Sequence, residues 1–267
     1  MASVLVFDLE TVPDVEGLRR AWGDFPPELD INDEDALVGH VLDRRQEKTG
    51  NRFLSLHFQR IVAIGCLFRR DDNKEPALQL RCLGQPEDSE ERLIRDFFRA
   101  VERYTPQLVS WNGGGFDLPV LHYRSLLHGV SASRYWEMGE GDREFRFNHY
   151  LGRYHTRHVD LMDMLSLYSP RSAAPLDQVA LLCGFPGKQG MDGSKVWSAF
   201  REGRIEEIRH YCEGDVLNTW LMWCRFQLVR GQVSHEQYRR ELELARKVVE
   251  DTGDRRWENL LQAWPQA

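Results

Sequence analysis

The stretch that decides the fold is SVLVFDLETV, at residues 3–12. Val4 to Phe7 form an uninterrupted apolar run, which is typical of a central strand buried on both faces. Two carboxylates, Asp8 and Glu10, follow one residue apart. Because alternate residues of a strand point to the same side, we expect both to project together from the end of this strand. Two like charges so placed are unfavourable unless a positive group lies between them.

The composition is that of an ordinary globular protein of 267 residues, with 42% hydrophobic and 29% charged residues. A formal net charge of −7 argues against a broad, non-specific nucleic-acid binder coated in Lys and Arg. It does not exclude an enzyme with a narrow groove, because bound metal ions would bring their own positive charge.

The sequence also favours a cytoplasmic protein without membrane contact. Its five cysteines form no CxxC pair, which disfavours a disulfide framework or a cysteine zinc site and indicates reduced thiols. The apolar run near the N-terminus is too short for a signal peptide. No apolar stretch approaches the ~20 residues of a membrane span.

The order of elements predicts an α/β fold with a mixed sheet covered by helices. We expect strands at residues 4–8, 60–70, 77–83, 107–111 and from 157, the second and third forming a hairpin. We expect a helix at 89–104, capped by Asp88, and a glycine-rich turn followed by a helix within 112–127. Further helices are expected up to 165, from 175 to an end at Gly184, at 203–229 and within 234–263. Residues 14–52 read as a polar insertion with one short helix near 34–45.

Two further acidic positions stand out by context. Asp117 follows NGGG, where a strand gives way to a helix, and Asp215 lies four residues after Tyr211 in the long helix. Residues four apart share a helix face, so Tyr211 and Asp215 can aim at one point. Taken singly, Asp117 could be a helix cap, Asp215 a solvated carboxylate and Tyr211 a packed aromatic. The full set, with Asp8 and Glu10, favours one shared site.

Such a set would suit the hydrolysis of a phosphodiester. That reaction needs an attacking water and charge stabilisation on both the attacking and the leaving oxygen. Two divalent ions about 3.5–4 Å apart provide it. Hard ions such as Mg²⁺ bind carboxylate oxygens, and a tyrosine hydroxyl could orient the attacking water.

Three segments resemble the motifs of DEDD-type 3′–5′ exonucleases of the subgroup with a tyrosine in the third motif. FDLET (7–11) is similar to the first motif and YCEGD (211–215) to the third. NGGGFDLPVL (112–121) is similar to the second motif, in the form seen in the proofreading domain of B-family DNA polymerases. Small stand-alone bacterial proteins described as predicted exonucleases share this resemblance, which covers roughly residues 3–228.

The resemblance implies a ribonuclease-H-like fold over residues 1–229, with a five-stranded mixed sheet flanked by helices and a helical C-terminal extension at 230–267. It implies a nuclease that uses two divalent ions, Mg²⁺ or Mn²⁺. The substrate would be a single-stranded or frayed 3′ end, of DNA slightly more than of RNA. The products would be nucleoside 5′-monophosphates.

The resemblance also implies roles for individual residues. Asp8, Glu10 and Asp215 would hold one metal, Asp8 would bridge to a second, and Asp117 would support it through water. Tyr211 would position the attacking water. The residues expected to contact substrate are Asn112, Leu9, Thr11 and Phe116.

Alternatives remain open from the residues alone. A haloacid-dehalogenase-like phosphatase would also place acidic residues after a first strand, and GDVLNT (214–219) approaches its last motif. Against it, Thr219 replaces an expected Asp, and the GD pair lies in a predicted helix rather than after a strand. A non-catalytic nucleic-acid-binding module on the same fold is another alternative.

Two smaller features admit several interpretations. GRYHTRHVD (152–160) could be a phosphate-contacting edge, a zinc cluster with Asp160 and Asp163, or a solvated loop. Lys188, in the turn GFPGK, could contact a phosphate.

Overall fold

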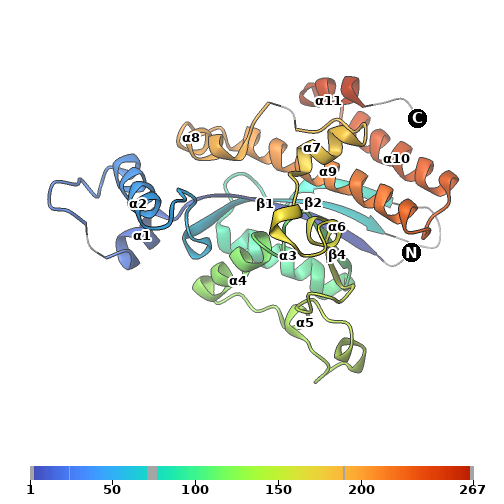
Figure 1. Ribbon diagram of the computed structural model, residues 1–267, viewed down its shortest axis with the longest axis horizontal. Helices are drawn as coiled ribbons and strands as arrows, with labels where there is room; N and C mark the ends of the chain where they lie inside the picture. Colours follow the sequence, from blue (N-terminus) through green and yellow to red (C-terminus); the bar gives the residue numbers. More distant parts are fainter. Residues whose placement is uncertain (1–2, 24, 71–76, 189, 265–267) are drawn as a thin grey trace.

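The computed structural model describes residues 3–23, 25–70, 77–188 and 190–264. Five strands form one mixed sheet in the order β3-β2-β1-β4-β5. In the centre, β1 pairs antiparallel with β2 and parallel with β4. This sheet, flanked by helices, confirms the predicted ribonuclease-H-like architecture (Figure 1). The strands are β1 (Val4–Pro13), β2 (Gln59–Arg70), β3 (Ala77–Cys82), β4 (Gln107–Ser110) and β5 (His158–Asp160).

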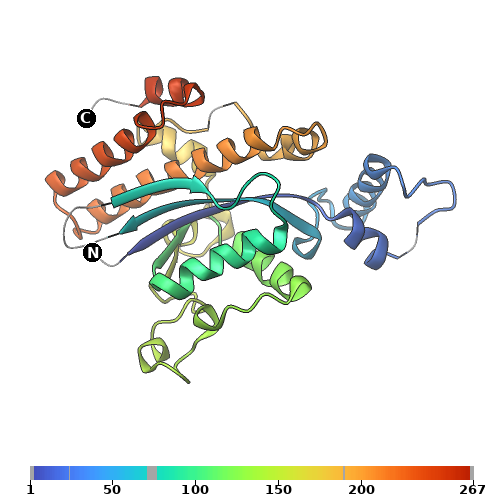
Figure 2. The ribbon, with the colours of Figure 1, turned by 180° about the vertical axis from the view of Figure 1, so that it is seen from behind.

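Helices cover both faces of the sheet, as the two opposite views show (Figure 1, Figure 2). One layer contains α7 (Leu176–Leu182), α9 (Ile205–Val229) and α10 (His235–Glu250), and the other contains α3 (Glu90–Tyr104) and α4 (Asp117–His128). Alternate residues of β1 belong to different cores. Val4 and Val6 pack with residues of α9, and Leu5, Phe7 and Leu9 pack with residues of α3 and α4. Asp8 and Glu10 therefore continue the side that faces α9.

The central strand is longer than predicted. We expected it to end at Asp8, yet β1 runs to Pro13 and pairs with β2 along its whole length, with a register shift between Glu10 and Thr11. The polar residues suggested an end, but the long partner strand β2 continues to satisfy their backbone groups. In contrast, β4 pairs with β1 only at Val4–Val6. Beyond that point, within the described residues, one edge of β1 has no strand beside it.

The predicted insertion forms a separate small lobe beyond the end of β1 (Figure 1). It contains two helices, α1 (Val15–Ala21) and α2 (Glu34–Thr49), instead of the single short helix expected. Asp33 caps α2, and the surface residues that follow position 45 are good helix formers, so the helix continues to Thr49. The lobe has its own apolar cluster, made of Val15, Leu18, Leu37, Val38, Val41, Leu54 and Phe58.

The C-terminal helices join the main core. Tyr238, Ala245 and Val249 of α10 are buried in the same cluster as Val4 and Val6 of β1. A buried ion pair adds to this contact, because Arg69 of β2 lies 2.7 Å from Glu241 of α10. Helix α11 (Glu258–Ala263) follows and contributes Leu260 to the cluster.

Smaller differences concern the ends of elements. Ser89, and not Asp88, caps α3, while the Asp88 side chain accepts a hydrogen bond from the Gln85 amide. The expected hairpin is confirmed by the antiparallel pairing of β2 with β3, and its turn at 71–76 lies outside the described residues.

The remaining helices are short, and two of them were not expected from the sequence. They are α5 (Ser133–Trp136), α6 (Leu161–Leu165) and α8 (Val196–Arg201), of which only α6 was expected. Among the described residues, no helix is both long and apolar enough to cross a membrane.

A buried ion cluster ties the lobe to the sheet and to two helices. The Arg124 guanidinium of α4 lies 2.6 Å from Glu90 at the start of α3 and 2.5 Å from Asp14, which caps α1. Glu90 also accepts a hydrogen bond from the Ile61 amide of β2 at 2.7 Å, and His128 lies 2.7 Å from it. One arginine thus neutralises two buried carboxylates from separate parts of the chain.

Replacing this arginine tests the cluster. We expect Arg124→Met to lower the free energy of unfolding by about 3–5 kcal/mol, because it leaves Glu90 and Asp14 buried without a cation. Arg99→Met, which removes an exposed arginine paired with Asp96, should cost less than ~1 kcal/mol. Urea unfolding measures both, and equal losses in the two variants would show that the cluster contributes nothing special.

Candidate active site

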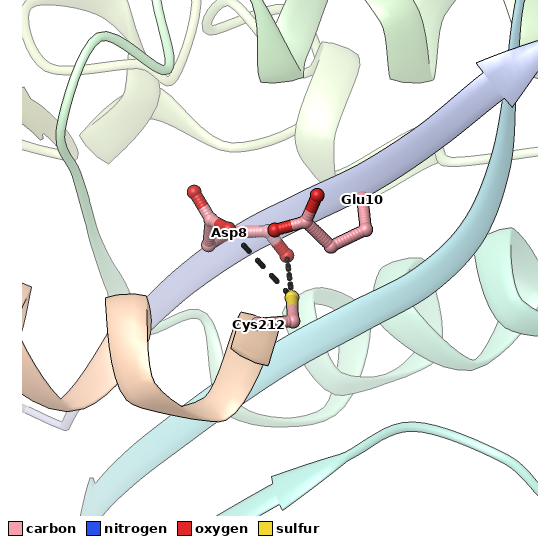
Figure 3. Close-up of side chains that lie close together, drawn as sticks. All are labelled: Asp8, Glu10 and Cys212. Carbon is pink, nitrogen blue, oxygen red and sulfur yellow. Dashed lines mark hydrogen bonds between the residues drawn. The ribbon is translucent and has the colours of Figure 1, made fainter. Parts of the chain in front are cut away.

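The two carboxylates of β1 lie together on the face that α9 covers. Oxygens of Asp8 and Glu10 and the sulfur of Cys212 all lie within 4.8 Å of one another (Figure 3). Burial is the main reason why the pKa of both carboxyls is raised well above its usual value, and the charges of Asp117 and Asp215 raise the pKa of Asp8 further. Acidic side chains from β1, α4 and α9 therefore share one electrostatic environment.

Asp117 is held toward β1 from the opposite layer. Its Oδ1 accepts a hydrogen bond from the Leu9 amide at 2.9 Å. At Leu9, β1 has already continued beyond its pairing with β4. The residue is the first of α4, and the N-cap position belongs to Phe116, which makes no side-chain capping bond. The Asp117 carboxyl therefore bridges to β1, and it also accepts a hydrogen bond from the backbone amide of its own residue at the start of α4. Burial raises the pKa of its carboxyl to about 7.

The glycine-rich loop before Asp117 is anchored by Asp160, a buried residue at the end of β5. Its carboxylate accepts hydrogen bonds from the Asn112 amide at 2.9 Å and from the Gly114 amide at 2.8 Å. Asn112 has a left-handed backbone, with φ of 65°. A side chain at Gly113 would come within 2.3 Å of the Ser110 hydroxyl. The loop thus needs both its small residues and Asp160 to present Asp117.

Helix α9 supplies Tyr211 and Asp215 on one face, as predicted, and both are buried. Lys188, in the loop after α7, reaches them: its Nζ lies 2.7 Å from Asp215 Oδ2 and donates to the Tyr211 hydroxyl. The tyrosine in turn bonds to Asp215. Burial, together with the charges of Asp215, Glu10 and Asp8, raises the pKa of Tyr211, so its hydroxyl keeps its proton.

Close packing of α9 on β2 sets the position of this helix. A side chain at Gly65 of β2 would come within 2.9 Å of the Cys212 sulfur, and the Gly65 amide donates to that sulfur at 3.2 Å. The Cys212 thiol faces the Asp8 carbonyl at 3.4 Å (Figure 3). Because position 65 is a glycine, the turn of α9 that carries Tyr211 and Asp215 can approach the sheet closely.

The donor set at the centre of the site fits a hard divalent cation. Burial raises the pKa of Cys212 well above its usual value, so this residue stays a neutral thiol that donates to Asp8. The anionic donors are then carboxylate oxygens, which Mg²⁺ and Mn²⁺ prefer and which soft metals do not. Raised pKa values of adjacent carboxyls also indicate a site where a bound cation would lower the electrostatic cost of ionising them.

The four residues expected to contact substrate belong to β1 and to the loop before α4. Asn112 and Phe116 flank the glycine-rich loop, and the Phe116 ring lies 5.8 Å from that of Phe53. The Thr11 hydroxyl donates a hydrogen bond to the Gln59 side chain at 2.9 Å. Leu9 is 4% exposed, with its side chain in the core and its amide on Asp117. Substrate contact by these residues stays a prediction.

Two alternatives from the sequence lose support. Asp215 lies within the 25-residue helix α9, so no strand precedes the GD pair as a haloacid-dehalogenase-like site would require. The zinc cluster proposed in segment 152–160 also loses support. His155 Nδ1 accepts a hydrogen bond from the His149 amide, and His158 Nε2 is hydrogen-bonded to the Ser110 hydroxyl. Within the part of the chain that the structure describes, the group close enough to share one ion consists of Asp8, Glu10 and Cys212.

Two residues of the site were missed or undervalued in the sequence. Lys188 was weighed only as a phosphate contact, yet in the structure it neutralises Asp215. Asp160 was weighed only as a zinc ligand, yet it organises the loop that carries Asp117. The sequence signal for Asp160 was its place at the end of a predicted strand next to that loop in the sheet.

Comparison with known proteins identifies one family. A protein-family model described as a predicted 3′–5′ exonuclease related to the exonuclease domain of PolB matches residues 51–264. The matched range includes Asp117, Tyr211 and Asp215 and continues through α11. The matched range begins after β1 and does not include Asp8 and Glu10. These two residues are placed in the site by the fold alone. No curated protein matches the chain.

Lys188 should matter most when metal is absent. We expect Lys188→Met to lower the free energy of unfolding in EDTA by about 1–2 kcal/mol, because Asp215 loses its charged partner. Saturating Mg²⁺ should recover most of that loss, since a cation then replaces the lysine. Thermal and urea unfolding in both buffers measure this. Lys195→Met, at an exposed lysine, should lose little in either buffer, and an Mg²⁺-independent loss in Lys188→Met would contradict the interpretation.

The raised pKa of Asp117 predicts a pH dependence. The folded state holds this proton up to about pH 7, whereas the unfolded chain releases it near pH 4, so ionisation costs stability as pH rises between these values. In EDTA, Asp117→Asn should therefore gain stability relative to wild type from pH 4 to 7, with a plateau above.

The control for this pH series is Asp251→Asn, at an exposed position after α10. Its stability relative to wild type should stay flat across the same range, and added Mg²⁺ should reduce the difference for Asp117→Asn. Urea unfolding at each pH gives both curves. Parallel curves for wild type and Asp117→Asn would refute the assignment.

Proposed function

Because the chain belongs to the family of predicted 3′–5′ exonucleases related to the exonuclease domain of PolB, we propose that it is a metal-dependent exonuclease. It removes nucleoside 5′-monophosphates from a single-stranded or frayed 3′ end. The observation that carries the proposal is the convergence of Asp8, Glu10, Asp117 and Asp215 from three separate elements, with Tyr211 beside them.

Asp8, Glu10 and Asp215 are the residues that would hold a divalent cation, with Asp117 supporting the far side. When bound, Mg²⁺ or Mn²⁺ would supply charge stabilisation to the attacking and leaving oxygens of the phosphodiester. Asp117 is fixed for this role because the Leu9 amide holds one oxygen, which leaves the second oxygen for a ligand or its water.

Tyr211 and Lys188 provide the other polar groups of the site. The protonated Tyr211 hydroxyl can donate to or accept from a water, and its position is fixed by Lys188 and Asp215. Lys188 neutralises part of the charge of the carboxylates through its ion pair with Asp215. Its ammonium would also be suited to contact a phosphate oxygen of the substrate.

DNA is the slightly favoured substrate. The support is the relation of the family to the exonuclease domain of a DNA polymerase. The acidic net charge of −7 also favours recognition of one strand end over broad binding of a duplex.

A cleavage assay tests the proposal. A 5′-labelled single strand with Mg²⁺ or Mn²⁺ should give a ladder that shortens from the 3′ end, and EDTA should abolish it. Asp8→Asn should lower the rate by more than ~100-fold, because even a residue behind a metal ligand is typically worth about 10–100-fold. Asp251→Asn should cleave like wild type. Full activity in a folded Asp8→Asn variant would overturn the site, and phosphate release from a phosphomonoester without a ladder would overturn the reaction.

A further inference from the structure

A concave surface lies next to the proposed active site. We call it the β5 cleft: a volume of about 520 Å³ between the glycine-rich loop, the first turns of α4, helix α6 and the segment 150–170. Its lining includes Asn112, Gly114, Leu118, Arg153 and Tyr168. The volume lies within the range of about 300–1,000 Å³ that is usual for ligand sites.

The cleft and the proposed catalytic carboxylates share the glycine-rich loop and the start of α4. Gly114, Gly115 and Leu118 line the cleft, and Asp117 lies between them in the chain. Gly114 and Gly115 are both exposed, so the loop that carries Asp117 is open to solvent where it lines the cleft.

The mouth of the cleft carries aromatic rings and a cation instead of a continuous basic surface. Tyr168 lines the cleft, and Tyr154, which is 76% exposed and lies outside the lining, places its ring 5.0 Å from that of Tyr168. The Arg153 guanidinium lies over the Tyr168 ring at 4.7 Å and only 3.6 Å from Asp163. The exposed Tyr154 ring, together with the half-buried Tyr168 ring that Arg153 covers on one face, suits the stacking of unpaired bases more than the tracking of a phosphate backbone.

The backbone that presents Tyr168 is unusual. Leu167 and Tyr168 both have left-handed conformations, with φ of 52° and 60°, which residues other than glycine rarely adopt. The Tyr168 amide is held by the Asp163 carbonyl at 2.8 Å, and its hydroxyl by the Arg153 carbonyl at 3.2 Å. These contacts keep the ring at the mouth of the cleft, although Leu167 next to it is 84% exposed.

We propose that the β5 cleft binds the unpaired nucleotides on the 5′ side of the bond that is cut, with bases stacking on Tyr168 and Tyr154. The inference rests on the proposed function, since an enzyme that holds a 3′ end at its carboxylates must lead the rest of the strand away from them. Because stacking replaces charge, binding should tolerate any base sequence, depend weakly on salt and exclude duplex.

Strand binding in EDTA tests the proposal without cleavage. Fluorescence anisotropy with a labelled single strand of about eight nucleotides should show Tyr168→Ala and Tyr154→Ala each weakening binding by ~10-fold, a typical value for one stacked base. Tyr154→Ala is the safer variant, because this exposed side chain is not needed for the fold. The matched control is Phe147→Ala, an aromatic residue 81% exposed outside the cleft, which should bind like wild type.

Kinetics with Mg²⁺ separate this proposal from the activity itself. For the long strand the tyrosine variants should raise KM with kcat unchanged, and for a dinucleotide, which offers the cleft a single base, the rise in KM should be smaller. A wild type that cleaves strands, with both tyrosine variants matching it in anisotropy and KM, would overturn the cleft assignment alone. A mononucleotide that binds as tightly as the strand would also overturn it. A wild type that neither binds nor cleaves any strand would overturn the proposed function as well.

Discussion

The structure depends on the compensation of negative charge in its most buried strand. Asp8 and Glu10 lie where burial and neighbouring carboxylates both disfavour ionisation. Lys188 offsets part of this charge through Asp215, and a divalent cation would offset more. The glycine-rich loop, the close approach of α9 at Gly65 and the position of the loop after α7 all bring groups to this one place.

The two faces of the sheet contribute unequal parts to the site. The α9 side carries Tyr211 and Asp215, which share a face with each other and with the carboxylates of β1. The α4 side carries Asp117, which reaches the same centre only because it bonds to the backbone of Leu9. A site assembled across a central strand in this way is as rigid as that strand, which is 0–4% exposed from Val4 to Phe7.

Much of this could be predicted from local pattern. The apolar run before Asp8, the two-residue alternation and the four-residue spacing of Tyr211 and Asp215 each follow from the geometry of a single element. The contacts of Lys188 could not be predicted, because they join a loop to distant elements and no periodicity reports them. For Asp160 the sequence offered only its place at the end of a predicted strand. The extension of β1 to Pro13 was missed for a related reason: the length of its partner β2, and not its own sequence, sustains it.

The short strand β4 has a consequence of its own. It pairs with β1 only as far as Val6, and beyond that point the parallel side of the central strand is an open seam in the sheet. At this open edge Asp117 accepts a hydrogen bond from the Leu9 amide, which a longer β4 would otherwise have bound. Two or three more paired residues in β4 would close the seam and displace the loop. The early end of one strand is therefore as necessary to this architecture as any of its acidic side chains.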